Sequence, residues 1–130
     1  MFKKFIKPVY AHCDVPCGIY ETDTMTHAAA TVKRMVERYE EIGGYDTTNA
    51  EAMNKAVRCV VTKEKHAQKC KDQLYLLWSD YFKPEHLDKF PDLHEIFWKA
   101  TKQCGTVKQT MSIEECDNCL LYTSPSPRDA

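Results

Sequence analysis

The chain of 130 residues has little glycine, no long apolar run and no excess of charge of one sign. Its 4 glycines stand among many alanine, lysine, glutamate and methionine residues, a composition that favours helices over sheets. No window approaches the roughly 18 apolar residues that a membrane span needs. With 18 basic and 19 acidic residues the formal net charge is −1, so no overall field attracts nucleic acid or an anionic membrane. These features argue against a membrane or nucleic-acid partner.

Cysteine, by contrast, is abundant, with 7 residues. An odd number leaves at least one thiol outside any closed set of intrachain disulfides. Residues 1–11 start with basic side chains, but Lys7 and Pro8 interrupt them before an apolar core of adequate length forms, so we expect no secretory signal. The expectation is a reducing compartment, where cysteine serves metal or redox chemistry more often than disulfide formation.

Apolar residues recur at steps of three and four along three segments, which is the pattern of amphipathic helices. The stripes run from Met25 to Ile42, from Met53 to Leu77 and from Phe90 to Cys104. The glycine pair at 43–44 is expected to end the first helix, and Gly105 the third. Residues 48–51 (Thr-Asn-Ala-Glu) and 112–115 (Ser-Ile-Glu-Glu) resemble capping boxes that begin the second and fourth helices.

The fourth helix is expected to be truncated, because Pro125 and Pro127 exclude a helix and no apolar period survives after Cys119. Residues 119–129 resemble the translation of a common transposase sequencing adapter, so we treat 119–130 as an extraneous tail. A genuine disordered tail is the alternative. The fold prediction is an all-α, up-and-down four-helix bundle with an N-terminal metal-binding hook.

Chemically distinctive residues gather at 12–20, which read His-Cys-Asp-Val-Pro-Cys-Gly-Ile-Tyr. A CxxxC pair alone is a weak signal, compatible with zinc, an iron–sulfur cluster, a disulfide or chance. Cleavage between Ala11 and His12 would change this. The new amine, the Cys13 amide nitrogen and the thiolates of Cys13 and Cys17 would then offer four donors in a plane, with the His12 imidazole on the axis. Such an N₂S₂ set suits Ni(II) or Cu(II) better than tetrahedral zinc.

Residues 12–20, together with 77–84 (Leu-Trp-Ser-Asp-Tyr-Phe-Lys-Pro) and 90–94 (Phe-Pro-Asp-Leu-His), resemble nickel superoxide dismutase. The likeness extends from His12 to about Asn118. It implies a precursor whose residues 1–11 form a propeptide, a processing protease that cleaves Ala11–His12, and a domain at 12–118. It also implies one nickel ion per subunit, a homohexamer and a cytoplasmic location.

The resemblance also assigns roles to the hook. His12 would give its amine and its axial imidazole, Cys13 its amide nitrogen and thiolate, and Cys17 its thiolate. Pro16 would turn the hook. In this reading a Ni(II)/Ni(III) cycle converts superoxide to oxygen and hydrogen peroxide.

Other positions would surround the metal. Tyr20 and Tyr81 resemble tyrosines that screen it and order water, while Asp14, Asp80 and Lys83 match residues around the entrance. The family also has a glutamate and an arginine that hold the axial imidazole. Here Ala28 and His66 stand at those positions.

Two other function classes remain open. One is a non-enzymatic helical protein that binds zinc or copper through the N-terminal thiol pair; the other is an interaction module in which Cys13 and Cys17 form a disulfide. The remaining cysteines of the domain are expected to be small core residues: Cys59, Cys70, Cys104 and Cys116.

Overall fold

A computed structural model of the chain describes residues 22–123, which are built from helices and connecting turns. None of the helices in this range is long and apolar enough to cross a membrane. The elements in chain order are α1 (Asp23–Glu41), α2 (Ala50–Leu76), the π-helix η2 (Leu77–Tyr81), α3 (His86–Lys89), α4 (Leu93–Gln109) and α5 (Ile113–Thr123).

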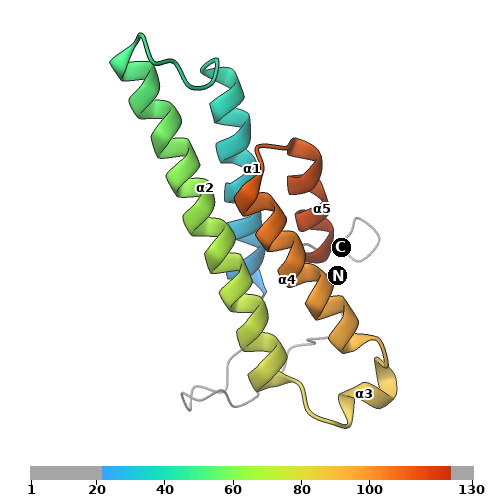
Figure 1. Cartoon of the computed structure of the whole chain (residues 1–130). Helices are drawn as coiled ribbons and strands as arrows, with labels where there is room; N and C mark the ends of the chain where they lie inside the picture. Colours follow the sequence, from blue (N-terminus) through green and yellow to red (C-terminus); the bar gives the residue numbers. More distant parts are fainter. Residues whose placement is uncertain (1–21, 124–130) are drawn as a thin grey trace.

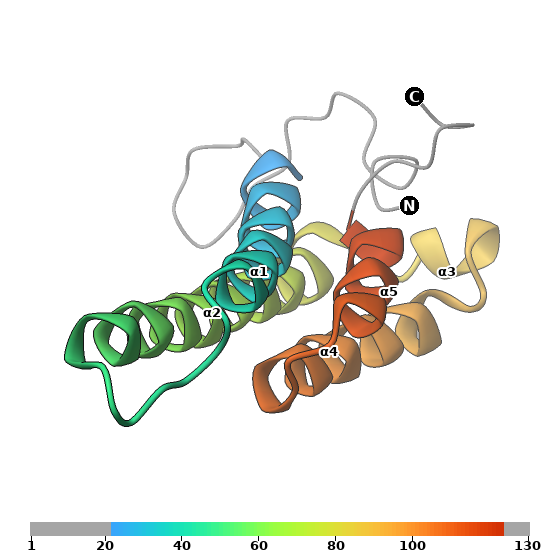
Figure 2. The ribbon, with the colours of Figure 1, turned by 90° about the horizontal axis from the view of Figure 1, so that it is seen from above.

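Four long helices surround a common core. Helix α1 packs against α2 and α5, and α4 packs against the same two helices, so the four form a closed ring (Figure 2). Successive long helices run in antiparallel order (Figure 1). The links from α1 to α2 and from α4 to α5 are short, whereas the link from α2 to α4 is longer and contains η2 and α3. The predicted all-α, up-and-down four-helix bundle is confirmed.

The core is made by the apolar stripes that the sequence pattern identifies. Met25, Val32 and Val36 of α1 are buried, as are Leu74 of α2 and Phe97 of α4. Burial of each such side chain contributes about 1.5–3 kcal/mol relative to exposure. The helices are therefore held by one continuous apolar cluster.

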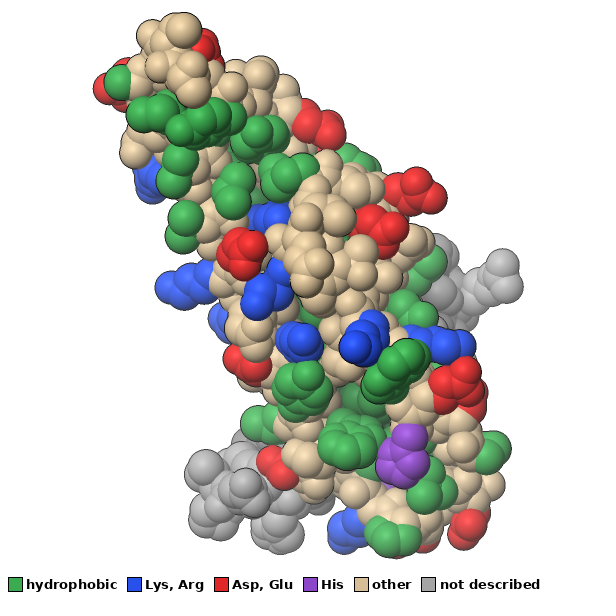
Figure 3. Space-filling view, viewed as in Figure 1, with side chains coloured by type: hydrophobic (Ala, Val, Ile, Leu, Met, Phe, Trp, Pro, Cys, Tyr) green, Lys and Arg blue, Asp and Glu red, His purple; other side chains and the backbone are tan. Residues whose placement is uncertain are grey.

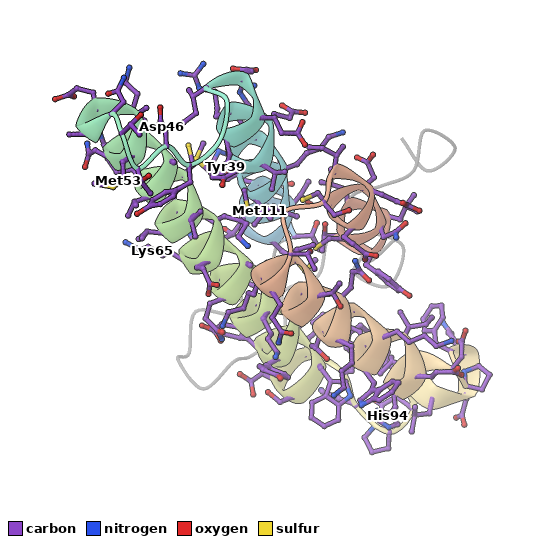
Figure 4. All side chains as sticks on the ribbon, turned by 45° about the horizontal axis from the view of Figure 1, so that its top comes forward. Tyr39, Asp46, Met53, Lys65, His94 and Met111 are labelled. Atoms are coloured by element: carbon purple, nitrogen blue, oxygen red, sulfur yellow. The ribbon has the colours of Figure 1, made fainter. Side chains whose placement is uncertain are left out.

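Of the two helix boundaries predicted between α1 and α2, one is confirmed and the other is wrong. Gly43 and Gly44 do end α1, with φ values of 83° and 80° that favour glycine. Thr48 does not cap α2, so that prediction is wrong. The cap is Asn49, whose Oδ1 accepts from the amides of Glu51 and Ala52 at 3.1 and 3.2 Å. The Thr48 hydroxyl instead donates to Asp46, which lies in the connection between α1 and α2 (Figure 4).

The second half of the chain departs further from expectation. Helix α4 continues past Gly105 to Gln109, because Cys104 and Val107 on either side of the glycine pack into the core. The Ser112 hydroxyl accepts from the Glu115 amide at 3.2 Å, which is one half of the predicted capping box, while the Glu115 carboxylate accepts from Nε2 of Gln103 at 2.7 Å. Helix α5 then extends to Thr123 with Cys119 buried, so the expected loss of helix after Cys119 is wrong.

A buried lysine of α2 forms hydrogen bonds with the C-terminal end of α4. The ammonium of Lys63, only 3% exposed, donates to the carbonyl oxygens of Lys108 and Thr110 at 2.6 and 2.8 Å. These carbonyls lie at the C-terminus of α4, where no intrahelical donor remains and the helix dipole favours a cation. Burial lowers the pKa of Lys63.

We expect Lys63→Met to reduce the free energy of unfolding by about 1–3 kcal/mol, because it leaves two helix-terminal carbonyls without their charged donor. Chemical denaturation measures the change. Lys65→Met is the matched control, since Lys65 is exposed on the same helix (Figure 4) and should shift stability by less than about 0.5 kcal/mol. Equal effects of the two substitutions would contradict the capping role.

Candidate functional site

The predicted site residues fall into two groups. The expected ligands His12, Cys13 and Cys17 lie outside the described residues, as do their predicted neighbours Asp14, Pro16 and Tyr20. The structure does describe the others: His66, Asp80, Tyr81 and Lys83.

Asp80, Tyr81 and Lys83 lie together where α2 ends. The last turn widens into η2, which buries Leu77 and Tyr81 on the same side. Phe82 then adopts an extended backbone, with φ −79° and ψ 141°. Pro84 explains the break, because proline disfavours the helical conformation of the residue before it. Short π-helical segments of this kind are frequent at functional sites.

Tyr81 is fixed by aromatic neighbours. Its ring meets Phe82 edge-on, with centroids 4.9 Å apart, and stacks on His86 with centroids 5.7 Å apart at 17°. Phe82 in turn packs on Phe97 of α4 at 5.3 Å. Burial raises the pKa of Tyr81, so its phenol stays neutral and able to donate a hydrogen bond at physiological pH. The ring is therefore anchored to the core.

Two charged side chains flank this phenol along the chain. Asp80 is half-buried and accepts a hydrogen bond from the Ser79 hydroxyl at 3.0 Å. Lys83 exposes its side chain, while its backbone amide donates to Nδ1 of His86 at 2.8 Å. The segment thus presents a carboxylate, a neutral phenol and an ammonium within four residues, a combination suited to attracting a small anion and handling its protons.

His66 is not close to this segment. It lies 15 residues before Tyr81, which corresponds to about 20 Å along the helix axis. Its Nδ1 donates to the Thr62 carbonyl at 2.9 Å, which leaves Nε2 without the proton in the neutral ring. Ala28, 1% exposed in the core, has no polar side-chain atom. The structure therefore brings Asp80, Tyr81 and Lys83 together, but not His66.

Sequence reasoning did not foresee a thiol cluster in the core. The sulfur atoms of Cys70, Cys104 and Cys119, from α2, α4 and α5, all lie within 4.8 Å of one another. Hydrogen bonds to Cys104 are the main cause that raises the pKa of Cys70 and of Cys119, and burial raises both pKa values further. The spacing of Cys119 three residues after Cys116 on α5 is the signal that could have placed it on the buried face.

The surroundings of this cluster favour a packing role over metal binding. Three thiolates inside an apolar core would carry uncompensated negative charge, which is costly to bury. The expected core role is confirmed for Cys70, Cys104 and Cys116, which are buried, whereas Cys59 is only half-buried. Burial raises the pKa of Cys116 to about 11.

An open apolar groove of about 440 Å³ lies between the end of α2 and α4. Exposed aromatic rings surround a histidine there, seen as the purple side chain among green ones in Figure 3. Trp78 donates from its indole nitrogen to Nδ1 of His94 at 2.8 Å. The lining includes neither Tyr81 nor Lys83, and its apolar character does not suit a small anion.

Comparison with known proteins gives consistent matches. The sequence profile of the family described as nickel-containing superoxide dismutase matches residues 7–123, from within the expected leader to the end of α5. The "Superoxide dismutase [Ni]" of Streptomyces coelicolor is 36% identical over 100 residues, which make up 77% of this chain and 70% of that protein. Its namesake from Streptomyces seoulensis is 35% identical over 114 residues, or 88% of this chain and 81% of that protein.

A solved structure agrees as well. The native crystal structure titled "Nickel Superoxide Dismutase (NiSOD)" superposes with a TM-score of 0.74 at 30% identity. The superposition covers 87% of this chain and 90% of that chain. The helical architecture therefore matches over nearly the whole length of both proteins.

We expect the core thiols to be protected from labelling in the folded protein. In a variant that lacks the N-terminal pair (C13S/C17S), Cys59 should react first with a thiol reagent, because it is the half-buried member of the described set. Cys70, Cys104, Cys116 and Cys119 should react only as the protein unfolds. The time course of labelling, resolved by peptide mass spectrometry, provides the measurement. Rapid labelling of Cys104 in the native state would contradict this burial.

Proposed function

The chain belongs to the family of nickel-containing superoxide dismutases, and we propose that His12, Cys13 and Cys17 hold the nickel ion of this enzyme. The reaction converts superoxide to oxygen and hydrogen peroxide. Nickel is the cofactor of the family and of the curated relatives. The assignment of the ligands rests on the hook sequence at 12–20.

The donor set fits this metal. After cleavage before His12 the chain would offer an amine, an imidazole, a backbone amide and two thiolates. Nitrogen and thiolate donors suit nickel, and an anionic amide is a ligand that zinc does not readily recruit. The bound ion supplies the one-electron oxidation and reduction of superoxide that no side chain of this protein can perform.

The residues at the end of α2 would serve the substrate. The Lys83 ammonium, on a chain whose net charge is −1, gives the superoxide anion a local positive target. Tyr81, with its neutral phenol, would donate hydrogen bonds to water or substrate near the hook. Asp14, Pro16 and Tyr20 complete the proposed surroundings from the hook itself, and Asp80 from η2. The single observation that carries this part is the clustering of Asp80, Tyr81 and Lys83 in one segment.

His66 occupies a different place in the proposal. Its Nε2 is available to contact an imidazole ring, but it lies far along α2 from Tyr81. We assign it to the surroundings of the metal on the strength of the sequence resemblance alone.

The proposal extends to maturation and assembly. Residues 1–11 are the propeptide, a protease cleaves between Ala11 and His12, the domain spans 12–118, and the mature enzyme is a cytoplasmic homohexamer. The five described cysteines are free thiols, which agrees with a reducing compartment. Residues 119–130, which resemble an adapter translation, are proposed to be absent from the natural protein, although residues 119–123 continue helix α5 in this chain.

The first test compares two forms of the chain. A chain beginning at His12 should bind one nickel ion per subunit and consume superoxide, whereas a chain that retains residues 1–11 should do neither, because its His12 nitrogen is a peptide amide. Metal analysis and a superoxide assay measure both properties. Stoichiometric zinc without activity in the cleaved form would favour the alternative of a zinc- or copper-binding protein.

The ligand assignment has its own control. Cys17→Ser in the cleaved form should abolish nickel binding and activity, because a hydroxyl does not replace a thiolate. Cys59→Ser, which changes a half-buried cysteine of α2, should leave both intact. Activity in the uncleaved chain would contradict the amine as a ligand.

The role of Lys83 predicts a salt-dependent effect. Lys83→Gln should lower the second-order rate constant with superoxide by about two- to fivefold at low ionic strength, since one steering charge is lost. The difference should shrink as salt is added, because the Debye length is about 10 Å at 0.1 M. Pulse radiolysis or stopped-flow kinetics over a salt series measures it.

Lys55→Gln is the matched control for net charge. Lys55 is exposed near the start of α2, at the opposite end from η2. Its removal should change the rate far less than the removal of Lys83. Equal losses would show that only the total charge matters and would contradict a local role for Lys83.

A further inference from the structure

His86, the first residue of α3, contacts both Tyr81 and Lys83, the two residues proposed above to serve the substrate. We propose that it is a positioning residue of the superoxide reaction, one that fixes Lys83 through its backbone and Tyr81 through its ring. This inference rests on the proposed roles of Tyr81 and Lys83. Nothing in the hook sequence or in the periodicity of the helices points to it.

The hold on Lys83 is reciprocal. Nδ1 of His86 accepts from the Lys83 amide at 2.8 Å, and the His86 amide donates to the Lys83 carbonyl at 2.9 Å. Both polar backbone groups of Lys83 are thus bonded to the same residue. Because Nδ1 must accept, it carries no proton in this arrangement.

These two hydrogen bonds take the place of the helical backbone hydrogen bonds that end at Tyr81. The helix ends at Tyr81, Phe82 is extended, and Pro84 has no amide hydrogen to donate. The Lys83 amide would otherwise be left to solvent. The turn from Lys83 to His86 therefore sets the direction in which the exposed Lys83 side chain leaves the protein.

The same imidazole also packs on Tyr81. The two rings are stacked, with centroids 5.7 Å apart and planes 17° apart, while the Phe82 ring meets His86 edge-on at 5.5 Å and 88°. The buried phenol is thereby held between the core and α3. One side chain couples the orientation of the proposed hydrogen-bond donor to that of the proposed steering charge.

Three substitutions separate the two contacts. His86→Asn keeps an acceptor near the position of Nδ1 but removes the ring. His86→Phe keeps a ring to stack on Tyr81 but removes the acceptor, and His86→Ala removes both. Each is made in the nickel-loaded chain that begins at His12 and is compared at equal nickel content and with its thermal midpoint recorded.

We expect His86→Ala to lower the second-order rate constant by about tenfold, less than the roughly hundredfold that a 1 Å misplacement can cost. His86→Phe should lose the salt dependence that Lys83 confers, and His86→Asn should retain it. Independently of activity, hydrogen exchange at the Lys83 amide should accelerate in His86→Phe and stay slow in His86→Asn, as measured by mass spectrometry of a peptide spanning residues 80–87.

His94→Ala is the matched control. Its Nδ1 also accepts a hydrogen bond, but from the Trp78 indole, and both residues line the apolar groove. Figure 4 labels His94 on α4. It should change neither the rate nor the salt dependence. A parallel loss in His94→Ala would assign the effect to general loosening of this end of the bundle and would overturn the inference.

Two outcomes separate the proposed role of His86 from the proposed role of Lys83. If Lys83→Gln weakens steering but His86→Phe leaves the rate, salt dependence and amide exchange unchanged, the role of His86 is wrong and that of Lys83 stands. If Lys83→Gln itself has no effect, the proposed role of Lys83 fails first. In the double variant, His86→Phe should add no further loss of salt dependence to Lys83→Gln, and a fully additive loss would overturn the coupling.

Discussion

The interruption of α2 is the constraint on which the arrangement of the site depends. Pro84 disfavours the helical conformation of Lys83, so the long helix cannot simply continue toward α4. It widens into η2, buries Tyr81 and releases the chain at Phe82. Because the release occurs at the end of a helix packed on both α1 and α4, an irregular segment is held on a rigid support. That combination holds the buried phenol of Tyr81 close in sequence to the exposed side chain of Lys83.

Along this segment the aromatic side chains pack into the core and the charged side chain of Lys83 faces outward. Tyr81 and Phe82 point into the aromatic contacts with α3 and α4, and Lys83 points outward. A small substrate gives an enzyme few contacts from which to draw binding energy, so local charge and proton supply matter more than the shape of a pocket. The apolar groove beside Trp78 has neither Tyr81 nor Lys83 in its lining, so its size alone does not make it the site of the predicted chemistry.

Periodicity predicted the four helices and their buried faces because burial of apolar stripes dominates their stability. Boundaries were harder. Thr48 and Asn49 are both good caps, and the bonding of Thr48 to Asp46 decides between them. Gly105 remains helical because its neighbours are buried, a tertiary effect that local propensity does not contain. The motif placed Asp80, Tyr81 and Lys83 together since they are adjacent in sequence, whereas His66 lies about three-fifths of the way along α2, far from the end at which these three residues lie.

The seven cysteines show how environment separates one residue type into two roles. A thiol binds nickel as a thiolate, so a competing site must release its protons. Three of the core thiols hold their protons: burial raises the pKa of Cys116 to about 11, and hydrogen bonds to Cys104 together with burial raise those of Cys70 and Cys119, whereas the same hydrogen bonds lower the pKa of Cys104 to about 4. At neutral pH these three thiols stay protonated, so they are weaker ligands for nickel than the proposed thiolates of Cys13 and Cys17. Burial therefore protects the selectivity of the proposed metal site as well as the stability of the bundle.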